Sequence, residues 1–90
     1  MRYKIDVFKN VKKNKEDEWY VGKVVQADFE IEADPTKKTA AKDICNALAD
    51  HKVVKESNLR IYNIIIGADV VIVAEKKTGK PICRLNRIKA

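Results

Sequence analysis

Apolar and polar side chains alternate along the first third of the chain. Near the N-terminus the odd positions are mostly apolar (Tyr3, Ile5, Val7, Val11) and the even positions mostly polar (Arg2, Lys4, Asp6, Asn10). A period of two is typical of a β-strand with one buried face. The same phase returns from Trp19 to Ala33, after a polar stretch from Lys12 to Glu18. We therefore expect two long strands joined by a polar loop.

An antiparallel hairpin is the simplest arrangement for these two strands. We predict a register in which paired residue numbers sum to 30, so that Arg2 faces Asp28 and Phe8 covers Gly22. In this register apolar residues face apolar residues and opposite charges meet, which favours the pairing.

A helix is expected after the hairpin. Asp34 can cap its free N–H groups and Pro35 suits its first position. Apolar residues then recur at three- and four-residue spacing, which predicts one stripe facing the sheet (Ala41, Ile44, Cys45, Leu48). The helix should end near His51 or Lys52.

The second strand is too long for this helix to cover. A helix of about 17 residues spans about 25 Å, whereas a strand from Trp19 to Ala33 would span about 48 Å. Lys9 and Lys23, on the covered face, mark where we expect the cover to stop. We therefore predict a projecting hairpin arm.

Three more strands complete the pattern: Leu59 to Ile66, Val70 to Glu75, and Ile82 to Ile88. Gly67-Ala68 predicts a two-residue turn with a positive φ at the glycine. The expected fold class is α+β, with the order ββαβββ: one helix packed on a mostly antiparallel sheet with a long N-terminal hairpin. Residues 1–90 are expected to form a single domain, given typical domain sizes.

The third and fourth strands are apolar on both faces, as Ile64 and Ile65 illustrate. Such strands are typical of the centre of a sheet that is covered twice. One helix covers only one face, so we predict a homo-oligomer, with a dimer favoured. The alternative is that the N-terminal hairpin covers the second face within one chain.

The formal net charge of +6 is confined to the C-terminal segment. Residues 1–75 hold 13 basic and 13 acidic side chains, and residues 76–90 hold no acid. We call the cations of this segment the basic patch: Lys76, Lys77, Lys80, Arg84, Arg87 and Lys89. Such a patch can bind nucleic acid, a ribonucleoprotein or an acidic protein surface. The alternative is a solvated edge strand whose lysines prevent aggregation.

The hairpin arm is a second candidate partner site. It carries lysines beside aromatic residues, a pattern that can bind single-stranded nucleic acid (Lys12, Lys13, Lys15, Trp19, Tyr20). The acidic run Glu16 to Glu18 argues against this hypothesis. The alternative is that Trp19 folds back onto the protein or into a subunit contact.

No arrangement of residues predicts catalysis, a metal site or a cofactor. His51 is the only histidine, and two distant cysteines cannot complete a zinc site with it. Cys45 and Cys83 are expected to be buried rather than nucleophilic, and the carboxylates from Asp28 to Asp34 to pair with basic neighbours. The chain has only two cysteines, and it has neither an apolar N-terminal signal segment nor an apolar stretch long enough to cross a membrane. These features favour a cytoplasmic protein.

The leading hypothesis is therefore a non-enzymatic, self-associating binding module that uses the basic patch. The alternative is a protein–protein effector, an inhibitor or accessory subunit of the phage or mobile-element type, that acts through the arm and the apolar sheet face. This order of elements occurs in many small bacterial and phage-type proteins. No residue motif identifies a family.

Overall fold

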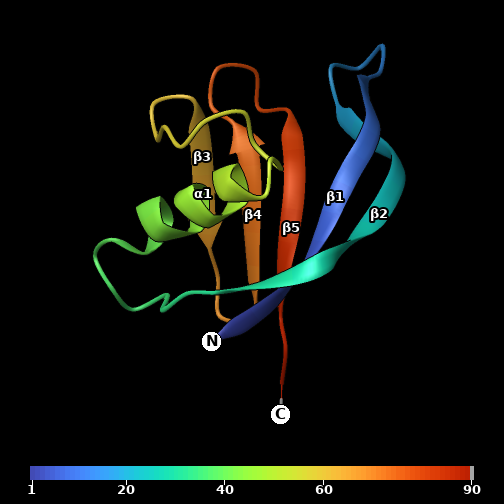
Figure 1. Cartoon of the computed structure of the whole chain (residues 1–90). Coiled ribbons are helices and arrows are strands. Elements are labelled where there is room, and N and C mark those ends of the chain that lie inside the picture. The colour runs from blue at the N-terminus through green and yellow to red at the C-terminus, as the bar shows by residue number, and fades with distance from the viewer. Residues whose placement is uncertain (90) are drawn as a thin grey trace.

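The structure is a computed structural model that describes residues 1–89. Five strands and one helix follow one another in the order ββαβββ (Figure 1). They are β1 Arg2–Lys13, β2 Trp19–Glu32, α1 Ala40–Asp50, β3 Tyr62–Ile66, β4 Val70–Glu75 and β5 Pro81–Arg87. All paired strands are antiparallel and α1 packs on the sheet, so the predicted α+β class with a long N-terminal hairpin is confirmed.

The strands are arranged in the order β2-β1-β5-β4-β3. The last strand lies in the middle, where Tyr3 pairs with Arg87 and Val7 with Cys83. Two predictions about position are therefore wrong. The third strand, expected at the centre because both of its faces are apolar, is an edge strand, and the C-terminal strand lies in the interior of the sheet rather than at an edge.

The hairpin of β1 and β2 has a different register from the predicted one. Pairs near the tip sum to 32 and pairs near the base sum to 34, with an irregularity between Lys4 and Asp6. Phe8 therefore faces Val24 rather than Gly22. The buried face was still predicted correctly, because a slip of two residues keeps every side chain on its own face.

The helix begins later than Asp34. The carboxylate of Asp34 accepts hydrogen bonds from the backbone N–H (3.0 Å) and hydroxyl (2.6 Å) of Thr36. These bonds hold the pKa of Asp34 below its ordinary value and close a local turn of the kind that Asp favours. The helix starts at Ala40, after Thr39, whose hydroxyl donates to Asp43 (3.0 Å). It has 11 residues.

The end of the helix agrees with the prediction. His51 is the C-terminal cap residue, and Lys52 follows in the left-handed region with φ of 61°. Two backbone bonds close the end, from Val53 N–H to Leu48 O (2.8 Å) and from Lys52 N–H to Ala49 O (3.0 Å). This is the Schellman motif, in which glycine is the usual residue at the position of Lys52.

The core lies between α1 and one face of the sheet (Figure 1). Buried side chains come from the helix, from every strand and from the segment after the helix (Tyr3, Ile5, Ile31, Ile44, Leu48, Val54, Tyr62, Val71, Val73, Leu85). Each fully buried aliphatic side chain contributes about 1.5–3 kcal/mol. The core therefore fixes which face of each strand points toward α1.

The other face of the sheet, here called the open face, is apolar on β3 and β4 and polar on β5 and β1. Ile65 is 54% exposed and Val70 37% exposed. The hairpin extends the sheet beside β5 instead of folding over this face, and among residues 1–89 no other element packs on it. The alternative in which the hairpin covers the second face within one chain is wrong.

Candidate functional site

The turn between β4 and β5 presents three cations of the basic patch: Lys76, Lys77 and Lys80. It is closed by backbone bonds from Glu75 N–H to Lys80 O and from Gly79 N–H to Glu75 O, both 2.8 Å. Gly79 has a φ of +79°, which side chains disfavour. The Thr78 hydroxyl donates to the Glu75 carboxylate (2.8 Å) and accepts from Lys80 N–H (3.2 Å). The turn is therefore an ordered platform for its lysines.

The tip of the hairpin arm is also held by its own side chains. The Asn14 side-chain oxygen accepts from Glu16 N–H (3.0 Å) and from Glu18 N–H (2.9 Å). Lys13 forms an ion pair with Asp17 (3.0 Å). These bonds fix the acidic run at the tip, and Lys13 is neutralised there.

Trp19 joins the arm to the β4–β5 turn. Its indole Nε1–H donates to the Thr78 carbonyl (3.2 Å), and the Lys13 ammonium lies 5.1 Å from its ring centre. Trp19 therefore folds back onto the protein instead of standing free. The bond brings the two segments that the sequence proposed as separate partner sites, residues 12–20 and 76–80, to the same end of the molecule (Figure 1).

The rest of the basic patch lies elsewhere and is paired with acids. Arg84 contacts Asp6 (3.1 Å), an aspartate that also accepts from Asn86 (2.8 Å). Arg87 and Lys89 both contact Asp69, at 3.7 Å and 3.2 Å. The structure therefore divides the predicted patch into a turn portion, Lys76 to Lys80, and a paired portion on and just after β5.

Lys9 and Lys23 were missed as candidate site residues, although both are exposed. They lie directly opposite each other in β1 and β2. Like charges in such a pair repel and destabilise the hairpin. The predicted register concealed this pairing, because a sum of 30 would place Lys9 opposite Val21 instead.

We call the combined feature the arm–turn surface. It consists of Lys9, Lys12, Lys13, Lys15, Trp19, Tyr20, Lys23, Lys76, Lys77 and Lys80. Lys9, Lys13, Lys23 and Trp19 share one face of the arm, and Lys12 and Tyr20 share the other. The segments that carry these eight lysines also carry four carboxylates (Glu16, Asp17, Glu18, Glu75), which leaves a surplus of four positive charges.

The two cysteines are buried, and the only histidine stacks on an aromatic ring. Cys45 and Cys83 are free thiols with no exposed surface. Burial, with a smaller effect of Cys45, raises the pKa of Cys83 to about 12, so its thiol is protonated at neutral pH. The His51 ring stacks on Phe29 at 3.8 Å between ring centres and 6° between planes.

One acidic residue of β2 has an ion-pair partner. Glu30 forms an ion pair with Arg2 at 2.8 Å, although Asp28 was the residue expected to face Arg2. Within residues 1–89 no group of histidine, cysteine and acidic side chains is arranged to hold a metal ion.

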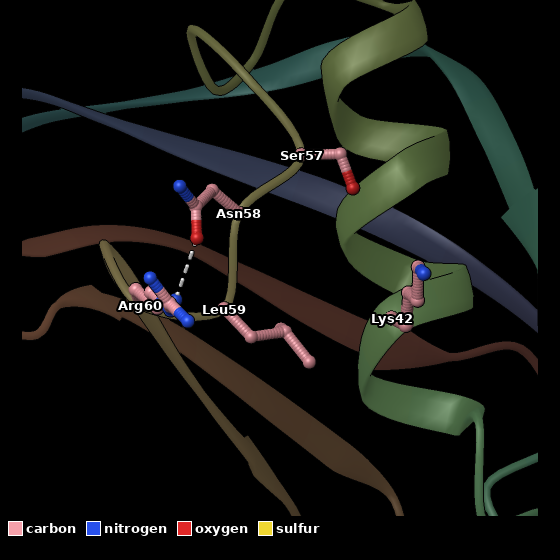
Figure 2. A pocket seen from close by; sticks show the side chains of 5 residues that line it. All are labelled: Lys42, Ser57, Asn58, Leu59 and Arg60. Atoms are coloured by element: carbon pink, nitrogen blue, oxygen red, sulfur yellow. Dashed lines mark hydrogen bonds between the residues drawn. The ribbon is translucent and has the colours of Figure 1, made fainter.

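A groove of about 290 Å³ lies between α1 and the segment that leads into β3 (Figure 2). Lys42, Ser57, Asn58, Leu59 and Arg60 line it. Ser57, the only serine, hydrogen-bonds to the side-chain oxygen of Asn46. An amide oxygen is no general base, so this serine lacks the activating partner that a nucleophile needs.

No helix within residues 1–89 is both long and apolar enough to cross a membrane. Comparison with known proteins found no matching family model, no matching curated protein and no matching solved structure.

Proposed function

We propose that this protein is a non-enzymatic binding module whose arm–turn surface binds single-stranded nucleic acid. The observation that carries the proposal is the bond from Trp19 to Thr78, which brings the arm and the basic turn together. Free thiols at Cys45 and Cys83 fit a cytoplasmic protein.

Phosphates of a bound nucleic acid would relieve the repulsion between Lys9 and Lys23. Lys9 and Lys23 repel each other across the hairpin, and an anion between them would convert that repulsion into attraction. Tyr20, on the other face of the arm, is 51% exposed and available to stack on a base. The carboxylates at the tip disfavour phosphate contact there, so we expect the phosphates at the Lys9–Lys23 pair and at the β4–β5 turn.

The salt dependence of binding tests this proposal. Fluorescence anisotropy with a labelled single-stranded oligonucleotide should show affinity falling steeply between 50 and 200 mM salt, since each phosphate contact contributes a log–log slope of about −0.7. Replacing Lys76, Lys77 and Lys80 by Gln should make the slope shallower by about 2. The matched control replaces three exposed lysines near the start of α1: Lys37, Lys38 and Lys42. No binding, a slope near zero, or equal effects of the two triple variants would reject the proposal.

A single substitution separates binding from stability. Lys23→Glu turns a repulsive pair into an attractive one, so the free energy of unfolding should rise by about 0.2–1 kcal/mol. Oligonucleotide affinity should fall at the same time. If Lys23→Glu binds as well as the wild type, the arm is not part of the interface.

The protein–protein effector remains the second candidate, because Ile65 and Tyr20 leave large apolar surfaces exposed. Capture from a lysate at moderate salt, with and without nuclease, distinguishes the two. Partners lost on nuclease treatment support nucleic acid. Partners that survive nuclease but are lost in Trp19→Ala support an inhibitor or accessory subunit.

A further inference from the structure

β3 has an outer edge with unused hydrogen-bonding groups. Lys76 N–H donates to Ile61 O (2.7 Å) and Gly67 N–H donates to Val70 O (2.9 Å), so the odd-numbered residues of this segment bond to β4. In an antiparallel strand, successive residues direct their backbone N–H and C=O groups alternately to the two sides. The groups of Ile64 and Ile66 therefore point away from β4. Among residues 1–89 no other strand lies on that side.

Apart from its short length of five residues, this edge lacks the features with which proteins protect an exposed strand. β3 reads YNIII, with no charged residue and no proline, and its pairing with β4 is regular. The opposite edge, β2, carries Lys23, Asp28, Glu30 and Glu32 and has an irregular register. An uncharged, regular edge strand is a template for another strand.

We propose that the edge of β3 pairs antiparallel with β3 of a second copy of this chain, centred on Ile65. Ile64 of each copy then lies opposite Ile66 of the other, and these pairs exchange four backbone hydrogen bonds. Ile65, the most exposed large apolar residue, packs against its counterpart on the open face. The result is a continuous ten-stranded sheet with both α1 helices on the same side.

The structure favours this register and a second copy as the partner. Tyr62 N–H already donates to Asn58 O (3.2 Å), which disfavours centring the pair on Ile64, because Tyr62 would then need that N–H for its partner. Centred on Ile65, the edge is complementary to itself, because the outward N–H and C=O groups of Ile64 meet those of Ile66 in the other copy and β3 carries no charged side chain that would repel its counterpart. The inference is independent of nucleic-acid binding.

Cysteine cross-linking tests the register. Residues at a non-hydrogen-bonded antiparallel pair have Cα atoms about 4.5 Å apart, within the range of a disulfide. Ile65→Cys should therefore form a covalent dimer under mild oxidation. Val70→Cys, exposed on the same face, should not. The native cysteines are fully buried and give no background. Equal or faster cross-linking of Val70→Cys would overturn the proposal and favour packing of two open faces.

Amide hydrogen exchange tests the same surface without mutation. As the protein concentration rises, exchange at Ile64 and Ile66 should slow, whereas exchange at Ile65, whose amide bonds to β4, should change little. The apparent mass should rise from the 10.3 kDa monomer over the same range. A monomer whose Ile64 and Ile66 amides stay unprotected at the highest concentration would refute a second copy as the occupant of this edge.

Discussion

Trp19→Phe is the most direct test of the contact that holds the arm to the β4–β5 turn. The substitution keeps an aromatic ring but removes the N–H that donates to the Thr78 carbonyl at 3.2 Å. That carbonyl lies at an exposed turn and can accept from water in the variant. We therefore expect the loss of one net hydrogen bond, with no cost for a buried unpaired group.

A net hydrogen bond of this kind contributes about 0.5–1.5 kcal/mol. The contact between Lys13 and the Trp19 ring, with 5.1 Å from ammonium to ring centre, adds about 0.5–1 kcal/mol at an exposed site and is partly kept by phenylalanine. Trp19→Phe should lower the free energy of unfolding by about 1 kcal/mol, and Trp19→Leu, which loses both contacts, by about 1–2 kcal/mol. For a domain of this size 1 kcal/mol corresponds to about 4–8 °C in Tm.

Urea unfolding followed by far-UV circular dichroism measures this effect, because the variant lacks the only tryptophan. Tyr20→Phe is the matched control, because Tyr20 is the neighbour of Trp19 and its side chain is 51% exposed. The control should stay within about 0.5 kcal/mol of the wild type. Equal stabilities of the two variants would refute the arm–turn contact. The contact would also be refuted if a soluble quencher reduced the tryptophan fluorescence of the wild type as readily in the native protein as in the unfolded protein.

Two further predictions concern the helix end and the core. Lys52→Gly should raise the free energy of unfolding by about 1 kcal/mol, because a side chain in the left-handed region costs about 1–2 kcal/mol and the flexibility of glycine in the unfolded chain offsets part of the stability gained by removing it. Thermal unfolding measures the change in stability. A variant no more stable than the wild type would contradict the Schellman geometry. Folding raises the pKa of Cys83 from 9.0 to about 12, so above pH 9 the unfolded chain loses a proton that the native protein keeps. Above pH 9 this group should therefore lower the free energy of unfolding by about 1.4 kcal/mol for each pH unit. Urea unfolding between pH 9 and 10.5 should show a smaller decrease in stability with pH for Cys83→Ala than for the wild type. Equal decreases in the two proteins would contradict the raised pKa.

The faces of the elements could be predicted from the sequence, whereas their positions in the sheet could not. Alternation near Tyr3 and Ile5 identifies the buried face, because burial acts on each residue separately. A register with pairs that sum to 32 instead of 30 leaves that alternation unchanged, so the pattern could not reveal that Lys9 lies opposite Lys23. Pairing of β1 with β5 joins residues about eighty positions apart and leaves no local signal.

The start of the helix was mispredicted for a local reason. Asp34 followed by Pro35 fits a helix N-terminus, yet Asp and Thr side chains also close turns by themselves. Here Thr36 supplies both the hydroxyl and the N–H that the Asp34 carboxylate accepts. The competing turn delays the helix to Ala40 and shortens it to 11 residues.

The charge surplus shows why a count along the chain cannot locate a binding surface. The acid-free segment from residue 76 to residue 90 suggested one patch, but antiparallel pairing places Arg84 beside Asp6, and the β3–β4 turn places Asp69 near Arg87. Two carboxylates from the neutral part of the chain, Asp6 and Asp69, therefore offset two of the three positive charges of that half. The lysines of the arm and of the β4–β5 turn are concentrated by the fold instead, since Trp19 bonds to Thr78. Binding should therefore depend on the Trp19 contact as much as on charge, and removing that contact should weaken a polyanion complex without changing the net charge of +6.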